Sequence, residues 1–260
     1  MIFDTHIHLN EERILENLDK YLLEAKNDGV VKFLCVGWDL ESSKLAVELA
    51  SKYENIYAAI AIMPTEHEKY NENSINELEA LLKTSDKIVA IGEIGLDYYW
   101  EKTDEIKAKQ QKMFIEQINL ANKYDLPLTI HARDAIQDTY DILKAHPVKK
   151  CGVLHCYSGS VEMAREFIKL GFKLGIGGTI TFKNSKVNKE VVKAVSIDDI
   201  VFETDAPYLA PMPYRGKLNE PRFIKKVPEY ISEMLNIDEK VLEDKAFDTS
   251  CKIFHVKHYE

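Results

Sequence analysis

The chain has 260 residues, of which 45% are apolar, so it can bury a sizeable core without covalent crosslinks. Its formal net charge of −9 has the wrong sign for a protein that wraps nucleic acid through broad electrostatic attraction. This charge is compatible with an enzyme that holds a phosphate chain locally, because bound cations can reverse the field inside a cleft.

Cysteine spacing and apolar runs indicate the environment of the protein. Its four cysteines, Cys35, Cys151, Cys156 and Cys251, show no C-x-x-C pairing, and the start of the chain lacks the basic and then apolar segments of a secretory signal. No apolar run approaches the roughly 20 residues that cross a bilayer. We therefore expect a cytoplasmic protein with reduced thiols and no membrane association. Nothing in the sequence indicates an obligate protein partner.

Short runs rich in β-branched residues recur along the chain and predict buried strands. They lie at residues 2–4, 31–36, 56–62, 88–91, 128–131, 153–155, 172–176 and 200–203. Helical stretches separate them, so strand and helix alternate about eight times. This pattern predicts the α/β class, with a single (β/α)8 TIM-type barrel as one domain over residues 1–260.

Two of the connecting segments are informative. In residues 104–124, apolar side chains recur at helical spacing and predict one buried helix face: Ile106, Met113, Phe114, Ile118 and Ala121. The Pro-rich stretch "APYLAPMPYRGKLNEP" follows the eighth predicted strand as a long loop, and long loops in compact domains tend to be functional.

Residues with metal-binding side chains lie at the carboxyl ends of the predicted strands. They are His6 and His8 at the first strand, Glu93 at the fourth, His131 at the fifth, His155 at the sixth and Asp205 at the eighth. In a barrel these ends converge on one face, where active sites are built. We therefore expect a metal site at the carboxyl ends of the strands, formed by all six side chains.

The first strand contributes two of these ligands. His6 and His8 are two residues apart, so both point to the same side of the strand and could share one cation. The same alternation turns Ile7 outward against the helices. It also places Asp4 on the histidine side, where its carboxylate could orient a metal-binding imidazole.

The other four residues complete a predicted two-metal site. Glu93 has two carboxylate oxygens and can bridge two cations, while His131 and His155 supply neutral imidazoles to the second cation. Asp205 can bind the first cation and accept a proton from its bound water. Open positions then remain for water and substrate.

Histidines beside strands are often hydrogen-bonded structural residues, and only the convergence of six ligand types favours a metal site here. The remaining histidines lie in loop or helical context beside charged residues. We predict that these four, His67, His146, His255 and His258, are solvated surface groups. The glycine-rich stretch "GIGGTI" lacks the spacing of a phosphate loop and indicates close packing after the seventh strand.

Several motifs together resemble the TatD family of metal-dependent deoxyribonucleases, within the amidohydrolase-like barrel hydrolases. They are "DTHIHL", "GEIGLDYYW", "HARDA", "HCYSGS", "GGTITFKN" and "ETDAPYLAPMPYRGKLNEP", in the family's order from Asp4 to Pro221. The resemblance implies two ligand sets for two divalent cations: His6, His8, Glu93 and Asp205 for one, and Glu93, His131 and His155 for the other. A glutamate on the fourth strand, rather than a modified lysine, favours the TatD branch.

The chain departs from the family at one point. Where TatD-like sequences carry G-x-H-P after the third strand, this chain has "AIMP", with Ala61 and Met63 replacing the glycine and histidine. We expect the loss of a polar contact to the substrate or leaving group, which affects rate and substrate preference more than the reaction class.

The metals define the expected mechanism, with Glu93 and Asp205 as catalytic residues. Two cations roughly 3.5 to 4 Å apart lower the pKa of a shared water, and the resulting hydroxide can attack phosphorus in line with the leaving oxygen. Asp205 would orient this hydroxide and take its proton. The imidazole-rich site suits Zn²⁺ or Mn²⁺, whereas the family resemblance implies Mg²⁺.

Cationic and aromatic side chains follow the same strands. Arg133, Lys183 and Arg215 lie in segments after the fifth, seventh and eighth strands and could bind phosphate oxygens or form ordinary surface salt bridges. The nearby aromatic residues could stack on unpaired bases, although walls of a pocket are the more common role for such rings. These aromatic residues are Tyr98, Tyr99, Trp100, Tyr157 and Tyr208.

The sequence therefore predicts a two-metal phosphodiesterase that binds DNA transiently and trims single-stranded ends. An alternative enzyme would hydrolyse small amides, lactones or phosphate esters with the same metals, because fold and metal ligands do not fix the substrate. A third possibility is a metal-dependent binding protein without turnover, which the presence of Glu93 and Asp205 argues against.

Overall fold

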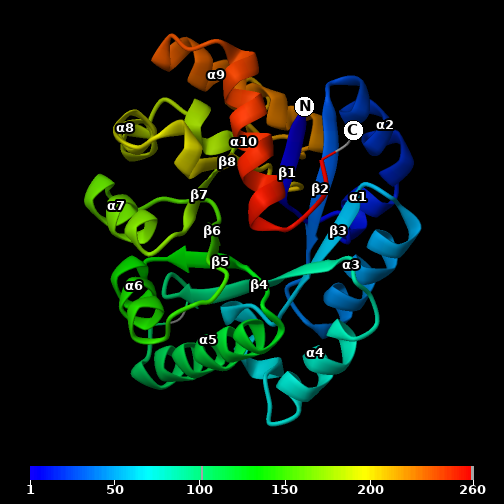
Figure 1. The fold of residues 1–260 in the computed structure, drawn as a ribbon, viewed down its shortest axis with the longest axis vertical. Helices are drawn as coiled ribbons and strands as arrows, with labels where there is room; N and C mark the ends of the chain where they lie inside the picture. The colour runs from blue at the N-terminus through cyan, green and yellow to red at the C-terminus, as the bar shows by residue number, and fades with distance from the viewer. Residues whose placement is uncertain (101, 259–260) are drawn as a thin grey trace.

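The computed structural model contains eight parallel strands in a single sheet, ordered β1 to β8 as in the sequence (Figure 1). It describes residues 1–100 and 102–258. The strands are β1 Ile2–Ile7, β2 Val30–Val36, β3 Ile56–Ile60, β4 Ile88–Asp97, β5 Leu128–Arg133, β6 Gly152–Leu154, β7 Lys173–Ile176 and β8 Ile200–Phe202. Each strand pairs in parallel with the next, as alternation of strands and helices requires.

Backbone hydrogen bonds join the end of β1 to the segment that follows β8. The Asp205 N–H donates to the carbonyl of His6 at 2.9 Å, and the His8 N–H donates to the carbonyl of Ala206 at 2.9 Å. The two edges of the sheet therefore meet, and the predicted (β/α)8 barrel is confirmed. These bonds also place Asp205 beside the two histidines at the start of the chain.

Helices surround the barrel and cover the outer face of the strands (Figure 1). The α-helices are α1 Glu12–Leu15, α2 Leu18–Asn27, α3 Leu40–Lys52, α4 Ser74–Leu82, α5 Asp104–Tyr124, α6 Ile136–Ala145, α7 Val161–Lys169, α8 Lys186–Ala194, α9 Lys226–Leu235 and α10 Glu239–Ile253. Four short 3₁₀ helices are η1 Pro64–Lys69, η2 Gly178–Thr181, η3 Ile197–Asp199 and η4 Pro221–Lys225. Within the described chain, none of the helices combines the length and apolar character needed to span a membrane.

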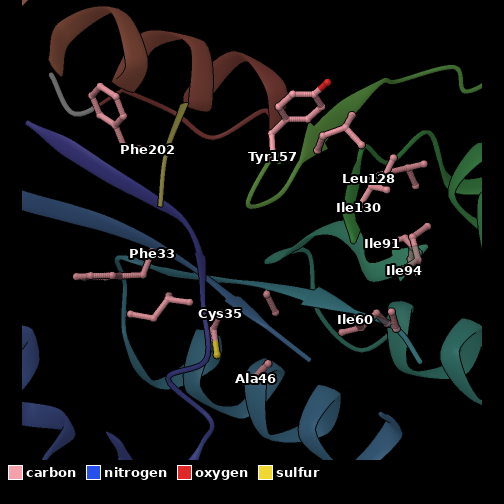
Figure 2. Packing of buried hydrophobic residues seen from close by; sticks show 14 of the residues in the cluster. Phe33, Cys35, Ala46, Ile60, Ile91, Ile94, Leu128, Ile130, Tyr157 and Phe202 are labelled. Atoms are coloured by element: carbon pink, nitrogen blue, oxygen red, sulfur yellow. The ribbon is translucent and has the colours of Figure 1, made fainter. Parts of the chain in front are cut away.

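Alternation along β2 separates two layers of buried side chains. Phe33 and Cys35 pack in the larger cluster between strands and helices, where Cys35 points toward α3 and its Ala46 (Figure 2). Leu34 and Val36 belong to a second cluster, and they face the barrel interior because neighbouring side chains on a strand point to opposite sides. The barrel is therefore a packed core rather than a pore. Lys32, on the same side of β2 as Leu34 and Val36, is buried in it too.

The strands differ from the prediction in their extent. We expected β1 to end at residue 4 and β4 at residue 91, but β1 continues to Ile7 and β4 to Asp97. Register shifts interrupt both strands, between Asp4 and Ile7 and between Ile91 and Ile94, and pairing resumes beyond them. Glu93 consequently lies within β4 rather than at its end.

Helix α5 matches its predicted range of residues 104–124. Thr103 accepts a hydrogen bond from the Ile106 N–H and caps the start, and Asp125 ends the helix in a left-handed conformation with φ of 52°. Along the predicted face, Phe114 and Ile118 have no exposed surface. Amphipathic spacing alone was thus sufficient to locate this helix.

Phe114 offers a test of the packing between α5 and the barrel. Replacing Phe114 with Ala should lower the free energy of unfolding by about 3 to 5 kcal/mol, because the lost apolar contacts leave a cavity. Urea unfolding followed by circular dichroism measures this change. Lys112→Ala on the same helix, where the lysine side chain is 73% exposed, is the control and should change the value by less than about 0.5 kcal/mol.

Candidate metal centre

Three of the six predicted ligands, His6, His8 and Asp205, lie around one oxygen of a fourth, Glu93. Its Oε2 lies 3.5 Å from Nε2 of His6 and 3.9 Å from Nε2 of His8. Oδ1 of Asp205 lies 3.4 Å from the same nitrogen of His8 and 4.0 Å from that of His6. Two imidazole nitrogens and two carboxylate oxygens therefore face a common point.

The other oxygen of Glu93 faces a second pair of histidines. Oε1 lies 2.8 Å from Nδ1 of His131 and 3.5 Å from Nε2 of His155. These three residues, like the group of His6, His8 and Glu93, have ligand atoms close enough to hold one metal ion. The structure thus brings all six predicted residues together and divides them between the two oxygens of a single carboxylate.

The ring nitrogens of His6 and His8 that face away from Glu93 have fixed partners. Nδ1 of His6 lies 3.0 Å from Oγ1 of Thr129, and Nδ1 of His8 lies 3.0 Å from the carbonyl of Val36. Since a carbonyl only accepts hydrogen bonds, Nδ1 of His8 carries the proton. In the neutral imidazole, Nε2 of His8 then carries the lone pair that could bind a cation.

The other two histidines, His131 and His155, each lie against a carboxylate that the sequence did not identify as part of the site. Nε2 of His131 lies 2.9 Å from Oδ2 of Asp97, and Nδ1 of His155 lies 3.2 Å from Oε1 of Glu203. Carboxylates behind metal-binding histidines fix the ring orientation and raise ligand basicity. The spacing of Asp97, four residues after Glu93 on the same strand, was a signal that could have identified it.

Glu203 is fully buried and held in place at the end of β8. Its Oε1 accepts a hydrogen bond from the Cys156 N–H at 2.6 Å. A side chain at Gly175 would meet Oε2 of Glu203 at 2.2 Å, so this glycine of β7 makes room for the carboxylate. Glu203 also forms a third group of possible ligands with His6 and His155. The glycine-rich stretch around β7 is therefore closely packed, as predicted.

Asp4 contacts a predicted metal-binding histidine through the backbone rather than through the imidazole ring. Its carboxylate accepts hydrogen bonds from the backbone N–H groups of His6 and Thr204 and from the Thr204 hydroxyl, and within the described residues none from an imidazole ring. The register shift in β1 breaks the strict alternation on which the prediction depended. Asp4 instead ties β1 to the segment after β8. Ile7 packs in the outer cluster, as expected.

The donor set fits divalent cations. Nε2 of His6 is buried and, among the residues that the structure describes, has no hydrogen-bond partner, although it faces two carboxylates. A buried polar atom without a partner is costly unless another group completes it. Imidazole nitrogens and carboxylate oxygens are ligands for Zn²⁺, Mn²⁺ and related ions. A metal between these groups would satisfy this nitrogen and offset the buried negative charge.

Neighbouring carboxylates raise the pKa values of the two histidines nearest Oε1 of Glu93. Burial alone would lower the pKa of His131, but the Asp97 and Glu93 carboxylates raise it to about 9. Burial likewise opposes the charges of Glu203 and Glu93, which together raise the pKa of His155 to about 10. Burial would raise the pKa of Glu93, but the His155 charge and the His131 hydrogen bond lower it.

Comparisons with known proteins identify the family. The family described as "TatD related DNase" matches residues 3–255. An uncharacterized metal-dependent hydrolase of Bacillus subtilis, YabD, is 39% identical over 98% of this chain and 100% of its own length. The crystal structure of YJJV, a TatD homolog from Escherichia coli, superposes with a TM-score of 0.93 at 30% identity and covers 98% of both chains.

The chain belongs to the TatD family. It is a metal-dependent hydrolase of that family, as its motifs predicted. The positions where TatD-like sequences carry G-x-H-P follow β3 here. Ala61 is buried, and the Met63 N–H donates to the carbonyl of Trp38 at 2.8 Å. Met63, which stands where the resemblance implies a histidine, is half-buried.

Two further sets of predictions concern surface residues. His67 is buried with 7% exposure, so its prediction as a solvated group is wrong; it lies in η1, which packs against α5 and β4. His255 and His258 are exposed, as expected. The predicted phosphate contacts Arg133, Lys183 and Arg215 are exposed too, and their role stays a prediction.

The raised pKa values predict a pH-dependent metal affinity for this TatD protein. His131 and His155 must lose protons to bind a cation, so affinity should increase as pH rises from 6 toward 9 and fall as pH decreases. The expected change is roughly tenfold per pH unit for each proton displaced. Calorimetric titration with Mn²⁺ in two buffers of different ionisation enthalpy measures both affinity and proton release. An affinity that is flat over this range, without proton release, would contradict the expectation.

Asp97 can be tested separately from the ligands. Asp97→Asn removes the charge behind His131 and should weaken metal binding about 10-fold to 100-fold. Asp141→Asn on α6 is the control, because Asp141 is exposed and accepts a hydrogen bond from Gln137 on the same helix. Equal metal affinity in the two variants would show that Asp97 has no role in orienting His131.

Proposed function

We propose that the protein is a two-metal phosphodiesterase that hydrolyses DNA, acting exonucleolytically on single-stranded ends. The observation that supports this most directly is the division of the Glu93 carboxylate between two groups of ligands. A carboxylate in this position can bridge two cations. Pairs of divalent ions are typical of enzymes that cleave phosphodiester bonds by in-line displacement.

The bound cations would polarise the phosphodiester and activate water for attack. The protein residues position these groups. Glu93, with 3% exposure, lies at the centre of the site. Each of the four surrounding imidazoles is held in place by a partner at the ring nitrogen that faces away from Glu93. The site is therefore organised before substrate arrives, so little reorganisation is needed during the reaction.

Asp205 is the proposed general base. Burial would raise its pKa, but the hydrogen bond with His8 and the charge of His155 lower it. The carboxylate is therefore ionised at neutral pH and able to take a proton. It is also less buried than Glu93, so water and substrate can approach it.

DNA as the substrate rests on family membership and on local charge. The matching family is described as a DNase, whereas the curated relatives are called only metal-dependent hydrolases. Arg133, Lys183 and Arg215 are the proposed contacts to phosphate oxygens. The net charge of −9 limits broad attraction to DNA, which suits an enzyme that binds its substrate transiently.

Incubation with end-labelled single- and double-stranded DNA tests this function. Protein with Mg²⁺, Mn²⁺ or Zn²⁺ should release mononucleotides, and faster from single strands. Asp205→Asn should lower the rate about 10²-fold to 10⁴-fold, because the general base is lost. Asp198→Asn, an exposed carboxylate of η3 paired with Lys245, is the matched control and should retain activity.

The same assay distinguishes DNA cleavage from the alternative activity on small molecules. If none of the three metals supports DNA cleavage but a small ester, lactone or amide is hydrolysed, the protein is a small-molecule hydrolase with this metal site. Stoichiometric metal binding without turnover of any substrate would instead indicate a binding protein.

A further inference from the structure

Aromatic residues beside the metal centre fall into two groups by exposure. Tyr98 and Tyr157 are buried, with 7% and 2% of their surface exposed, and form walls of the core. Tyr99 and Trp100, which follow β4, are 44% and 67% exposed. An exposed indole next to a polar site is unusual unless a ligand covers it, because large apolar rings gain free energy from burial.

Arg133 lies against both exposed rings. The centre of its guanidinium is 3.7 Å from the centroid of the Tyr99 ring and 5.4 Å from that of Trp100. The two rings meet edge to face, with centroids 4.8 Å apart and an interplanar angle of 88°. Within the described part of the chain no ion pair involves Arg133, so its N–H groups remain available to an anion.

The cluster of Tyr99, Trp100 and Arg133 is fixed to the metal centre through Asp97. Oδ1 of Asp97 accepts a hydrogen bond from the Tyr99 N–H at 2.9 Å, while Oδ2 lies 2.9 Å from Nε2 of His131. Asp97 also pairs with Arg133 in the sheet, and the Tyr98 N–H donates to the Arg133 carbonyl. One carboxylate thus positions both a metal-binding histidine and the aromatic cluster.

We propose that Tyr99, Trp100 and Arg133 form a subsite for one nucleotide of a single strand, adjacent to the phosphate held at the metals. This proposal rests on the proposed function and identifies part of its substrate recognition. The exposed face of Trp100 stacks on an unpaired base, and Arg133 binds the phosphate of that nucleotide. A base in a duplex has both faces covered by its neighbours, so the subsite selects single strands.

The charge of the cluster favours a nucleic acid over an apolar partner. A hydrophobic docking surface would have to desolvate the guanidinium of Arg133 without offering it an anion, which is costly. A nucleotide presents a flat ring and an anionic phosphate within one unit. Stacking is also indifferent to base identity, so the subsite should confer strand preference without sequence preference.

Binding to an Asp205→Asn background tests the subsite without cleavage. The probes are a fluorescein-labelled thymidine oligonucleotide and the same oligonucleotide with abasic residues, followed by fluorescence anisotropy in the presence of Mn²⁺. The parent should bind the intact strand about 10-fold to 100-fold more tightly than the abasic strand. Adding Trp100→Ala should remove most of this difference, while Trp100→Phe should preserve it.

Leu23→Ala on α2 is the matched control, because this apolar side chain is 61% exposed and lies outside the metal centre. It should leave the preference for the intact strand unchanged. Because the readout is a ratio between two ligands on one protein, partial misfolding of a variant does not imitate the expected result.

Two results would overturn the subsite: equal affinity of the parent for intact and abasic strands, or a preference that persists in Trp100→Ala. Failure of the proposed function is a different result. In that case the wild-type protein cleaves no DNA with any metal, whatever its preference for the intact strand in the binding experiment.

Discussion

The buried carboxylate of Glu93 is the group on which the rest of the site depends. An ionised carboxylate at 3% exposure is costly to bury unless opposite charges or hydrogen bonds compensate it. Here the compensation comes from four histidines, two at each oxygen. Displacing any strand that carries one of these histidines would leave the Glu93 charge without part of its compensation. The positions of the ligands and the closure of the barrel therefore depend on each other.

The contacts that close the barrel involve residues of the metal site. β1 and the segment after β8 are joined by backbone bonds at His6 and Asp205 and by the Asp4 carboxylate, which bonds to Thr204. Burial raises the pKa of Asp4 to about 8, although its hydrogen bonds with Thr204 and His6 oppose this shift. The contacts that bring the two ends of the sheet together thus also place Asp205 opposite the first histidines.

Much of this arrangement was predictable from the sequence because parallel strands impose it. The eight apolar runs gave the barrel, and ligand types near their carboxyl ends gave the six residues that meet at Glu93. The groups behind the ligands were harder to find. Asp97 lies beyond residue 91, where the predicted fourth strand ended, and burial of Glu203 depends on the missing side chain of Gly175.

Local irregularities account for the errors. The register shift in β1 invalidated simple alternation at Asp4, and the shift in β4 allowed that strand to continue past Glu93. The prediction for His67 was wrong because its charged neighbours in the sequence indicated a solvent-exposed position. In the structure, η1 packs against α5 and β4. Such features arise from long-range packing, which neighbouring residues in a sequence do not report.

The edges of the site differ in what they can recognise. On the side of β2 and β3, Trp38 and Met63 offer apolar surface, and the Trp38 ring packs edge to face with His8 at 5.4 Å. On the side of β4 and β5, Arg133 carries a charge beside exposed rings. In the proposed function, Arg133 therefore supplies a cationic contact on the β5 side of the site, whereas Met63 supplies none on the β3 side. Because Met63 stands where the family usually carries a histidine, we expect the segment after β4 to contribute more to substrate recognition than the segment after β3.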